Sequence, residues 1–334
     1  MQTMHMADVL ELLAYHKDLP EDMAAESFAR LMDGTMTPAQ AGSFLMGLKT
    51  KGETAAELAA AVRAALAHAR LVPGLSGARI DTCGTGGDKS CSFNCSTAVA
   101  LVLAGMGYQV VKHGNRAITS TCGSADALEA LGLPLVTEPQ DVAGQLARRK
   151  FVFLFAPSYH PAFKHIMPIR KEIGCRTLFN LLGPLLNPAR PTHQILGVSI
   201  PHFLNRMAKV LALTGVQKAA VVHGAGGMDE LTPFGPNSVV WMRDGWLREE
   251  VLDPADLGFA AGSAEAVAVT TKEEAVDVLR QVLAGKGPQA MADMVALNVA
   301  AALHLLEDRL SLKDAVGRAR EALAAGVGEK PLNA

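Results

Sequence analysis

The sequence GTGGD at residues 84–88 carries the clearest chemistry in this 334-residue chain. Its three glycines allow a tight turn and let backbone N–H groups approach an anion, because no Cβ lies in the way. A helix is expected to begin at residues 94–97 (NCST), where unpaired N–H groups and the helix dipole favour phosphate. Asp88 would repel a phosphate unless its carboxylate holds a sugar hydroxyl or a metal. The loop therefore indicates a phosphorylated sugar, with an ordinary glycine-rich turn as the alternative.

A second candidate loop has the sequence KHGNR at residues 112–116. It offers cationic and neutral donors within five residues, and Gly114 lets the backbone come close to a ligand. A solvated basic turn is the alternative for this motif alone. Residues 120–126 add hydroxyl groups and another helix start, at which Ser124 either caps the helix or binds an anion.

Two adjacent acids, Asp229 and Glu230, follow a glycine-rich stretch at residues 223–228. Their negative charge is tolerable beside a phosphate site if Mg²⁺ bridges them to a diphosphate. Without the phosphate motifs they would be interpreted as surface acids.

Beyond residue 78, short strand-like runs alternate with helical stretches. This pattern predicts an α/β fold with a mostly parallel central sheet flanked by helices. Ligands in such sheets bind past the carboxyl ends of the strands. Each candidate loop directly follows a run, so four loops are expected to meet at one rim. The first run ends at Ile80, and the others lie at 109–111, 151–155, 194–198 and 219–222. The four loops lie at 84–88, 112–116, 156–160 and 223–230.

The first 72 residues are predicted to form a small all-helical domain. Thr37 to Gln40 and Thr54 to Glu57 both match a capping box, and each opens a helix with one apolar face. Residues 73–77 (PGLSG) interrupt the pattern as a linker or hinge. We expect part of 160–185 to pack on the helical domain, while 78–159 and 186–334 form the α/β domain. A hairpin about Asp244-Gly245 and helices at 272–283, 289–306 and 311–324 complete the chain.

Composition excludes several classes of protein. A net charge of -2 without a long Lys/Arg run gives no basic field for nucleic acid. Charged residues break up any signal-peptide core at 1–19, and no apolar run approaches the ~20 residues of a membrane span, so a cytoplasmic location is expected. Five scattered cysteines favour reduced thiols, and Cys91 and Cys95 lack the partners of a zinc site.

Together, these motifs resemble the anthranilate phosphoribosyltransferase family of tryptophan biosynthesis over nearly the full chain. The resemblance implies a helical domain joined to a larger α/β domain, and a homodimer formed through the helical domain. It also implies Mg²⁺-dependent transfer of the phosphoribosyl group of 5-phosphoribosyl-1-diphosphate to anthranilate. The motifs that carry it are GTGGD, NCST, KHGNR with GSAD at 123–126, AP…HP at 156–161, RTLFNLLGP at 176–184 and Asp229-Glu230.

The resemblance also assigns residues to roles. The donor, phosphoribosyl diphosphate, would be bound by Gly84, Gly87, Asp88, Ser92, Asn94, Cys95, Ser96, Thr97, Lys112, His113, Gly114, Asn115, Arg116, Ser120 and Ser124. Anthranilate would be bound by Gly84, His113, Asn115, His160, Arg170, Gly183 and Pro184. Magnesium would be held by Ser96, Asp229 and Glu230. The reaction needs no covalent nucleophile, and His113 is the candidate proton acceptor.

Two other functions fit part of the pattern. A pyrimidine nucleoside phosphorylase would carry a Lys-His-Ser-type loop in place of KHGNR. A non-catalytic, nucleic-acid-binding relative would lose GTGGD or the acid pair and gain basic surface. Neither signature is present. The chain departs from the family at Lys89, at Cys95 and at 185–188 (LLNP), none of which removes a named ligand.

Overall fold

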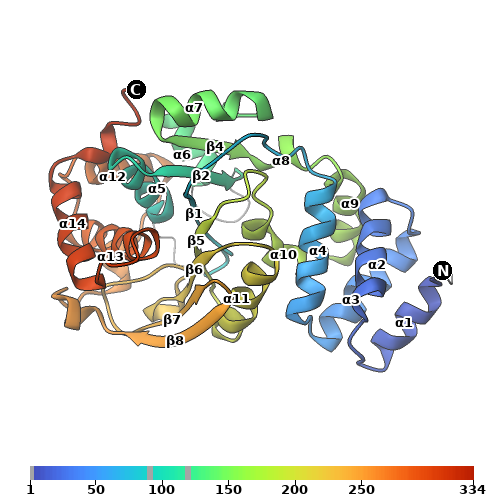
Figure 1. Cartoon of the computed structure of the whole chain (residues 1–334). Coiled ribbons are helices and arrows are strands. Elements are labelled where there is room, and N and C mark those ends of the chain that lie inside the picture. Colours follow the sequence, from blue (N-terminus) through green and yellow to red (C-terminus); the bar gives the residue numbers. More distant parts are fainter. Residues whose placement is uncertain (1–3, 89–92, 117–121) are drawn as a thin grey trace.

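The computed structural model describes residues 4–88, 93–116 and 122–334, and places a helical bundle beside a larger α/β unit (Figure 1). The Thr37 hydroxyl accepts from the Gln40 amide and the Thr54 hydroxyl from the Glu57 amide, which confirms both predicted capping boxes. The apolar faces of these two helices are buried in the bundle. The bundle helices are α1 (Met6–Ala14), α2 (Glu21–Asp33), α3 (Pro38–Lys51) and α4 (Ala55–Ala67).

A single eight-stranded sheet forms the centre of the α/β unit, in the order β3-β4-β2-β1-β5-β6-β7-β8. The first six strands in chain order are parallel, and β7 and β8 extend the sheet as an antiparallel hairpin. The predicted α/β class with a mostly parallel sheet is therefore confirmed. The strands are β1 (Arg79–Gly84), β2 (Gln109–Gly114), β3 (Leu135–Val136), β4 (Phe151–Phe155), β5 (His193–Gly197), β6 (Lys218–His223), β7 (Asn237–Arg243) and β8 (Trp246–Leu252).

The hairpin turn is also confirmed, with positive φ values of 47° at Asp244 and 86° at Gly245. Two successive positive φ values are the backbone geometry of a tight two-residue turn. The two-residue strand β3 was not predicted, because so short a segment has no alternating pattern.

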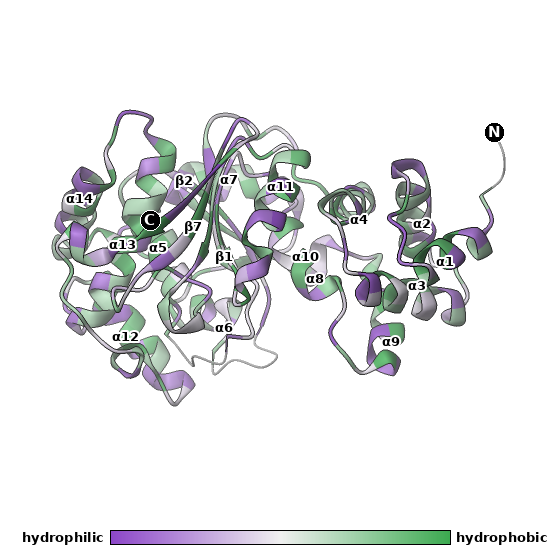
Figure 2. Cartoon of the chain, turned by 90° about the horizontal axis from the view of Figure 1, so that it is seen from below, coloured by the Kyte–Doolittle hydropathy of each residue, from purple (hydrophilic) through white to green (hydrophobic). Residues whose placement is uncertain are grey.

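Helices cover both faces of the sheet. One layer contains α5 (Cys95–Gly105), α6 (Ser124–Ala130), α12 (Lys272–Leu283), α13 (Gln289–Leu306) and α14 (Leu312–Ala324). Within it, α5 packs against α13 (Figure 2). Helix α13 has the length and apolar composition of a membrane span, yet most of it is buried in this core. The opposite face carries α7 (Val142–Arg149) near β4 and α11 (Leu204–Leu213) against β6 and β7.

A later segment of the chain returns to the bundle. Helix α9 (Phe163–Ile173) packs on α2 and α3, and α10 (Phe179–Leu182) packs on α4; the short α8 (Ala156–Tyr159) precedes both. One apolar core runs from the bundle through α9 and α10 to the face of the sheet covered by α11. The bundle is therefore attached to the α/β unit through buried side chains as well as through the linker at 73–77.

A buried histidine in β5 makes the stability of this fold sensitive to acid. His193 is only 4% exposed, its Nδ1 lies 2.8 Å from the Thr192 hydroxyl, and its Nε2 is buried with no partner in the described part of the chain. Burial, followed by the charge of Lys218, lowers its pKa to about 4. The unfolded chain takes up this proton near pH 6.5 and the folded chain does not, so acid favours unfolding.

We predict that His193→Gln flattens the pH dependence of stability. Between pH 6 and pH 4.5, the wild-type free energy of unfolding should fall more steeply than that of the variant, by up to about 1.4 kcal/mol per pH unit. Urea unfolding at several pH values measures both slopes. The exposed His202→Gln should keep the wild-type slope. Equal slopes for wild type and His193→Gln would show that His193 is not buried in its neutral form.

Candidate active site

The candidate site lies where the carboxyl ends of β1 and β5 meet. These two strands are neighbours in the middle of the sheet. Beyond β1 the next strands are β2 and β4, and on the opposite side, beyond β5, the next strand is β6. Such a change of direction leaves a crevice beyond the strand ends, which is where open α/β sheets bind ligands. The GTGGD loop leaves β1 at this point.

Two paired glycines form the floor of the site. Gly84 of β1 lies opposite Gly197 of β5. A Cβ on Gly84 would lie 2.2 Å from Asp229 Oδ2, and a Cβ on Gly197 would lie 1.5 Å from the Asp229 carbonyl oxygen. The amide of Gly86 donates to Asp229 Oδ2 over 2.6 Å. The acidic loop after β6 thus crosses β5 and rests on the phosphate loop, and only glycine permits this approach. No sequence motif identifies Gly197, whose one signal is its place near the end of the strand-like run at 194–198.

The two acids are half-buried, and their carboxyl groups are poorly compensated. Glu230 Oε1 accepts the Ser96 amide over 2.9 Å, while Oε2 is buried without a hydrogen-bond partner among the described residues. Burial, followed by the charge of Asp229, raises the pKa of Glu230 to about 8. Burial and the charge of Asp88 also raise the pKa of Asp229. Excess negative charge in a buried position favours a bound cation.

These acids fit Mg²⁺ as part of a site completed by a substrate. Among the described residues, no group of three His, Cys, Asp or Glu side chains is arranged to hold a metal by itself. Magnesium is commonly held by one or two carboxylates together with substrate phosphates and water. The unpartnered Glu230 Oε2 and the adjacent Asp229 and Ser96 are such a partial ligand set.

Lys112 places a positive charge close to this acidic pair. Its side chain is 2% exposed, and its ammonium group donates to the Thr82 carbonyl oxygen and, over 3.2 Å, to the Ser96 hydroxyl. The carboxyl group of Asp81 is fully buried nearby; burial raises its pKa to about 6, although the charge of Lys112 opposes this shift. A fixed positive charge therefore lies under the start of α5, as expected for part of an anion site.

The start of α5 presents further polar atoms that lack partners. Asn94 Oδ1 and Thr97 Oγ1 are buried without a hydrogen bond to a described residue, while Asn94 Nδ2 donates to the Cys122 carbonyl over 2.9 Å. The Cys95 side chain is buried in the core, so any contact that this residue makes with an anion falls to its backbone. Ser92, Ser120 and Lys89 lie outside the described residues.

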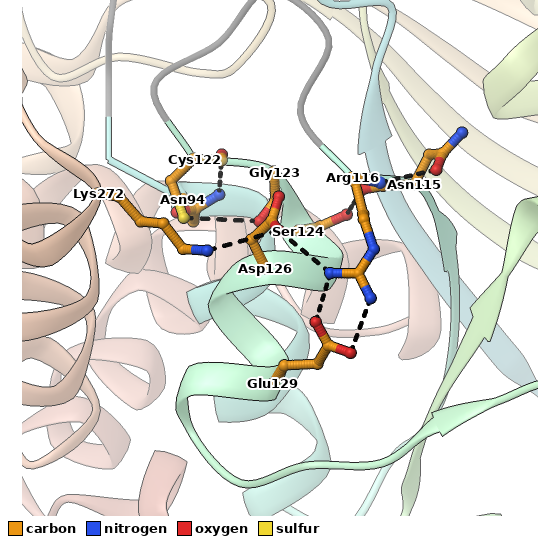
Figure 3. Close-up of polar contacts among 9 residues, drawn as sticks. All are labelled: Asn94, Asn115, Arg116, Cys122, Gly123, Ser124, Asp126, Glu129 and Lys272. Carbon is orange, nitrogen blue, oxygen red and sulfur yellow. Dashed lines mark hydrogen bonds and ion pairs between the residues drawn. The ribbon is translucent and has the colours of Figure 1, made fainter.

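The loop after β2 is held against α6 (Figure 3). Arg116 pairs with both carboxylate oxygens of Glu129, at 2.5 and 2.9 Å, and with Asp126 at 3.3 Å. Ser124 is the first residue of α6 and donates to the Asn115 carbonyl over 3.4 Å. The interpretation of Ser124 as the helix cap is wrong, because Gly123 occupies the N-cap position and no side chain caps the helix.

A row of rings extends from β2 through α9 to α10. The His113 and His160 rings lie 5.2 Å apart, His160 and Phe163 5.6 Å apart, and Phe163 and Phe179 5.5 Å apart. At the end of the row, Arg170 Cζ lies 5.5 Å from the Phe179 ring centre. Burial lowers the pKa of His113 to about 3 and that of His160 to about 4, so both rings are neutral at pH 7. Flat rings ending at a guanidinium suit an aromatic carboxylate.

The remaining predicted acceptor residues lie beside this row. The backbone of Gly183 lies beside His113 and opposes the lowering of that residue's pKa, and the Pro184 carbonyl accepts Gln194 Nε2 over 2.7 Å. The structure thus brings together His113, His160 and Gly183, which come from three separate motifs, and Arg170, which lies outside the motifs. The sequence interpretation gave no role to Phe163, which lies just after the motif at 156–161, or to Phe179, which lies inside the motif at 176–184.

Comparison with known proteins agrees with this geometry. Residues 7–69 match the family model described as "Glycosyl transferase family, helical bundle domain", and residues 76–328 match "Glycosyl transferase family, a/b domain". An anthranilate phosphoribosyltransferase of Oleidesulfovibrio alaskensis is 60% identical over 99% of this chain and 100% of its own length. The chain belongs to the anthranilate phosphoribosyltransferase family.

Solved anthranilate phosphoribosyltransferases have the same fold. The enzyme from Thermus thermophilus superposes with a TM-score of 0.88 at 38% identity, covering 98% of this chain and 97% of that one. The Saccharomyces cerevisiae enzyme in complex with PRPP and Mg gives a TM-score of 0.88 at 27% identity, covering 98% and 96%. A second complex of the yeast enzyme contains 4-fluoroanthranilate.

In this member of the family, the glycine floor gives a direct test of the site geometry. We predict that Gly197→Ala lowers turnover at least 10-fold and destabilises the fold by about 1–3 kcal/mol, because the new methyl group displaces the Asp229 backbone. Gly42→Ala in α3 is the matched control, since nothing lies within 4 Å of its Cβ position. Urea unfolding and steady-state turnover measure both variants. Wild-type behaviour of Gly197→Ala would mean that the acidic loop does not rest on β5.

Proposed function

We propose that the chain transfers the phosphoribosyl group of 5-phosphoribosyl-1-diphosphate to the amine of anthranilate, giving N-(5-phosphoribosyl)anthranilate and diphosphate. One observation carries this assignment. Adjacent residues of β2 point to opposite sides, so Lys112 joins the anion loops while His113 joins the ring row. A charged donor and a flat aromatic acceptor would therefore meet at the end of one strand.

The donor would lie across the β1 loop and the start of α5. The supporting features are the glycine-rich loop at 84–87, in which Gly86 is exposed, the Asn94 and Thr97 oxygens that lack partners among the described residues, and the buried Lys112. Gly114 and Ser124 would complete the cradle, since a Cβ on Gly114 would lie 2.6 Å from Ser124 Oγ. The whole proposed set is Gly84, Gly87, Asp88, Ser92, Asn94, Cys95, Ser96, Thr97, Lys112, His113, Gly114, Asn115, Arg116, Ser120 and Ser124.

Asp229, Glu230 and Ser96 would hold Mg²⁺. When bound, Mg²⁺ neutralises the negative charge that develops on the departing diphosphate. The Ser96 and Gly86 amides, which now contact the two carboxylates, would help to place these ligands.

The protein would act on the acceptor mainly by positioning it. The Arg170 guanidinium would pair with the anthranilate carboxylate, with Asn115, His160, Gly84, Gly183 and Pro184 beside the ring. The amine is aromatic and already neutral at pH 7, so it can attack C1 of the ribose without prior deprotonation. The C1–diphosphate bond breaks as the C1–N bond forms, with positive charge developing on the sugar. Neutral His113 would accept the proton that the nitrogen then loses.

We further propose a cytoplasmic homodimer formed through the helical bundle. Tyr15 at the end of α1 is 70% exposed, which offers apolar surface for such a contact. Light scattering should give a mass of twice 35.1 kDa. A monomer at micromolar concentration would contradict this part of the proposal.

Product analysis tests the reaction itself. The protein is incubated with Mg²⁺ and phosphoribosyl diphosphate plus anthranilate, and separately with thymidine plus phosphate. Mass spectrometry should find N-(5-phosphoribosyl)anthranilate in the first mixture and intact thymidine in the second. Cleavage of thymidine without the anthranilate product would identify a nucleoside phosphorylase instead.

A further inference from the structure

The Arg176 guanidinium lies directly over the GTGGD loop, yet none of the roles above includes this residue. A Cβ placed on Gly87 would lie 2.3 Å from Arg176 Nη2 and 2.8 Å from Nη1. Gly87 has a φ of +81°, which favours glycine on conformational grounds alone. The missing side chain thus permits the turn and also leaves room for the guanidinium against the loop backbone.

The Arg176 guanidinium differs from that of Arg116, which also lies close to the loops, in its carboxylate partners. Arg116 is occupied by Glu129 and Asp126. Arg176 is exposed and forms no hydrogen bond or ion pair with any residue in the described part of the chain. Its charge is therefore presented at the phosphate loop without a carboxylate to neutralise it. A planar guanidinium fork can bind two oxygens of one phosphate.

The chain segment that carries Arg176 is in contact with the helical bundle. Cys175 Sγ contacts Lys49 Nζ at 3.3 Å and Met46 Sδ at 3.7 Å, both on α3. On the other side, the Thr177 amide donates to Asn180 Oδ1 over 3.0 Å ahead of α10. One residue of this segment thus contacts the bundle, while the next lies on the donor loop of the α/β unit.

We propose that Arg176 binds a phosphate group of the donor, from the side of the site formed by the bundle. This proposal rests on the proposed function, because it takes the GTGGD loop as the donor site. It adds a contact that links the donor loop to the segment carrying Arg170 and the acceptor site.

Donor-fragment binding tests the proposal. Calorimetry of Arg176→Gln with Mg²⁺ and inorganic diphosphate, and separately with ribose 5-phosphate, should show one of the two bound roughly 10- to 150-fold more weakly than by wild type. The fragment that is affected identifies which phosphate Arg176 contacts. KM for phosphoribosyl diphosphate should rise by a similar factor, KM for anthranilate should stay within about twofold, and Arg176→Lys should restore part of the loss.

The control removes an equivalent charge elsewhere. Arg148 is an exposed residue of α7 whose guanidinium contacts Gln145, and Arg148→Gln should bind both fragments as wild type does. Unchanged binding of both fragments by Arg176→Gln, or a loss confined to anthranilate, would overturn the proposal. Wild-type turnover distinguishes failure of the Arg176 proposal from failure of the proposed function. If the wild type is active and Arg176→Gln behaves normally, only the Arg176 contact is contradicted.

Discussion

Turnover at low Mg²⁺ concentration is expected to fall by on the order of 10²- to 10³-fold in the double variant Asp229→Asn, Glu230→Gln. The two carboxylates are half-buried negative charges that lie against the phosphate loop, and their raised pKa values indicate that nothing in the described protein fully compensates them. Amides keep their shape but bind magnesium weakly. A titration of turnover against Mg²⁺ should show a higher metal requirement as well as a lower maximum.

The adjacent acids Glu249 and Glu250 of β8 supply the matched control. Replacing them with Gln removes the same charge from an exposed strand far along the sheet, and turnover should not change. Thermal unfolding should show no loss of stability in the Asp229→Asn, Glu230→Gln variant. In the wild type, partial burial of the two carboxyl groups already disfavours their charged forms, so removing the charges costs no stability. Wild-type turnover of the site variant at low Mg²⁺ would remove the metal role from Asp229 and Glu230.

The second large effect is expected at the acceptor end of the site. Arg170→Ala should weaken anthranilate binding roughly 10- to 150-fold, since a charge-assisted hydrogen bond contributes about 1.5–3 kcal/mol. Donor affinity should barely change, because Arg170 lies at the far end of the ring row, beyond Phe179. Calorimetric titration with each ligand separates the two affinities.

Lys171 is the control for this experiment, as the next basic residue in the last turn of α9 and an exposed one. Lys171→Ala should bind both ligands normally. Equal losses for donor and acceptor in Arg170→Ala, or a loss for the donor alone, would place Arg170 in the wrong part of the site. Arg170 and Arg176 are thus expected to give opposite selectivities, although they are only six positions apart in the chain.

Local sequence signals predicted the local structure well. The capping boxes at Thr37 and Thr54 succeed because donor and acceptor lie three residues apart in the chain, so no tertiary contact is needed. Ser124 shows the limit of such signals. Its residue type suits an N-cap, but the preceding Gly123 occupies that position and leaves the hydroxyl to contact Asn115.

The arrangement of the site depends on contacts between distant parts of the chain. Gly197 matters because a loop more than thirty residues later crosses it. Arg176 reaches a glycine almost ninety residues earlier, and the carboxylate partners of Arg116 lie on α6 rather than in its own motif. Such pairings follow from strand order and helix packing, which no short motif encodes. The motifs therefore predict which residues lie near the site, whereas the fold determines which of them are in contact.

The central claim is tested most directly by the fluorescence of anthranilate. Purified protein is mixed with anthranilate, phosphoribosyl diphosphate and Mg²⁺, and the loss of anthranilate fluorescence is followed over time. The rate should rise in proportion to protein concentration and should vanish when either the donor or Mg²⁺ is left out. No loss of fluorescence at any protein concentration, with all three components present, would contradict the assignment.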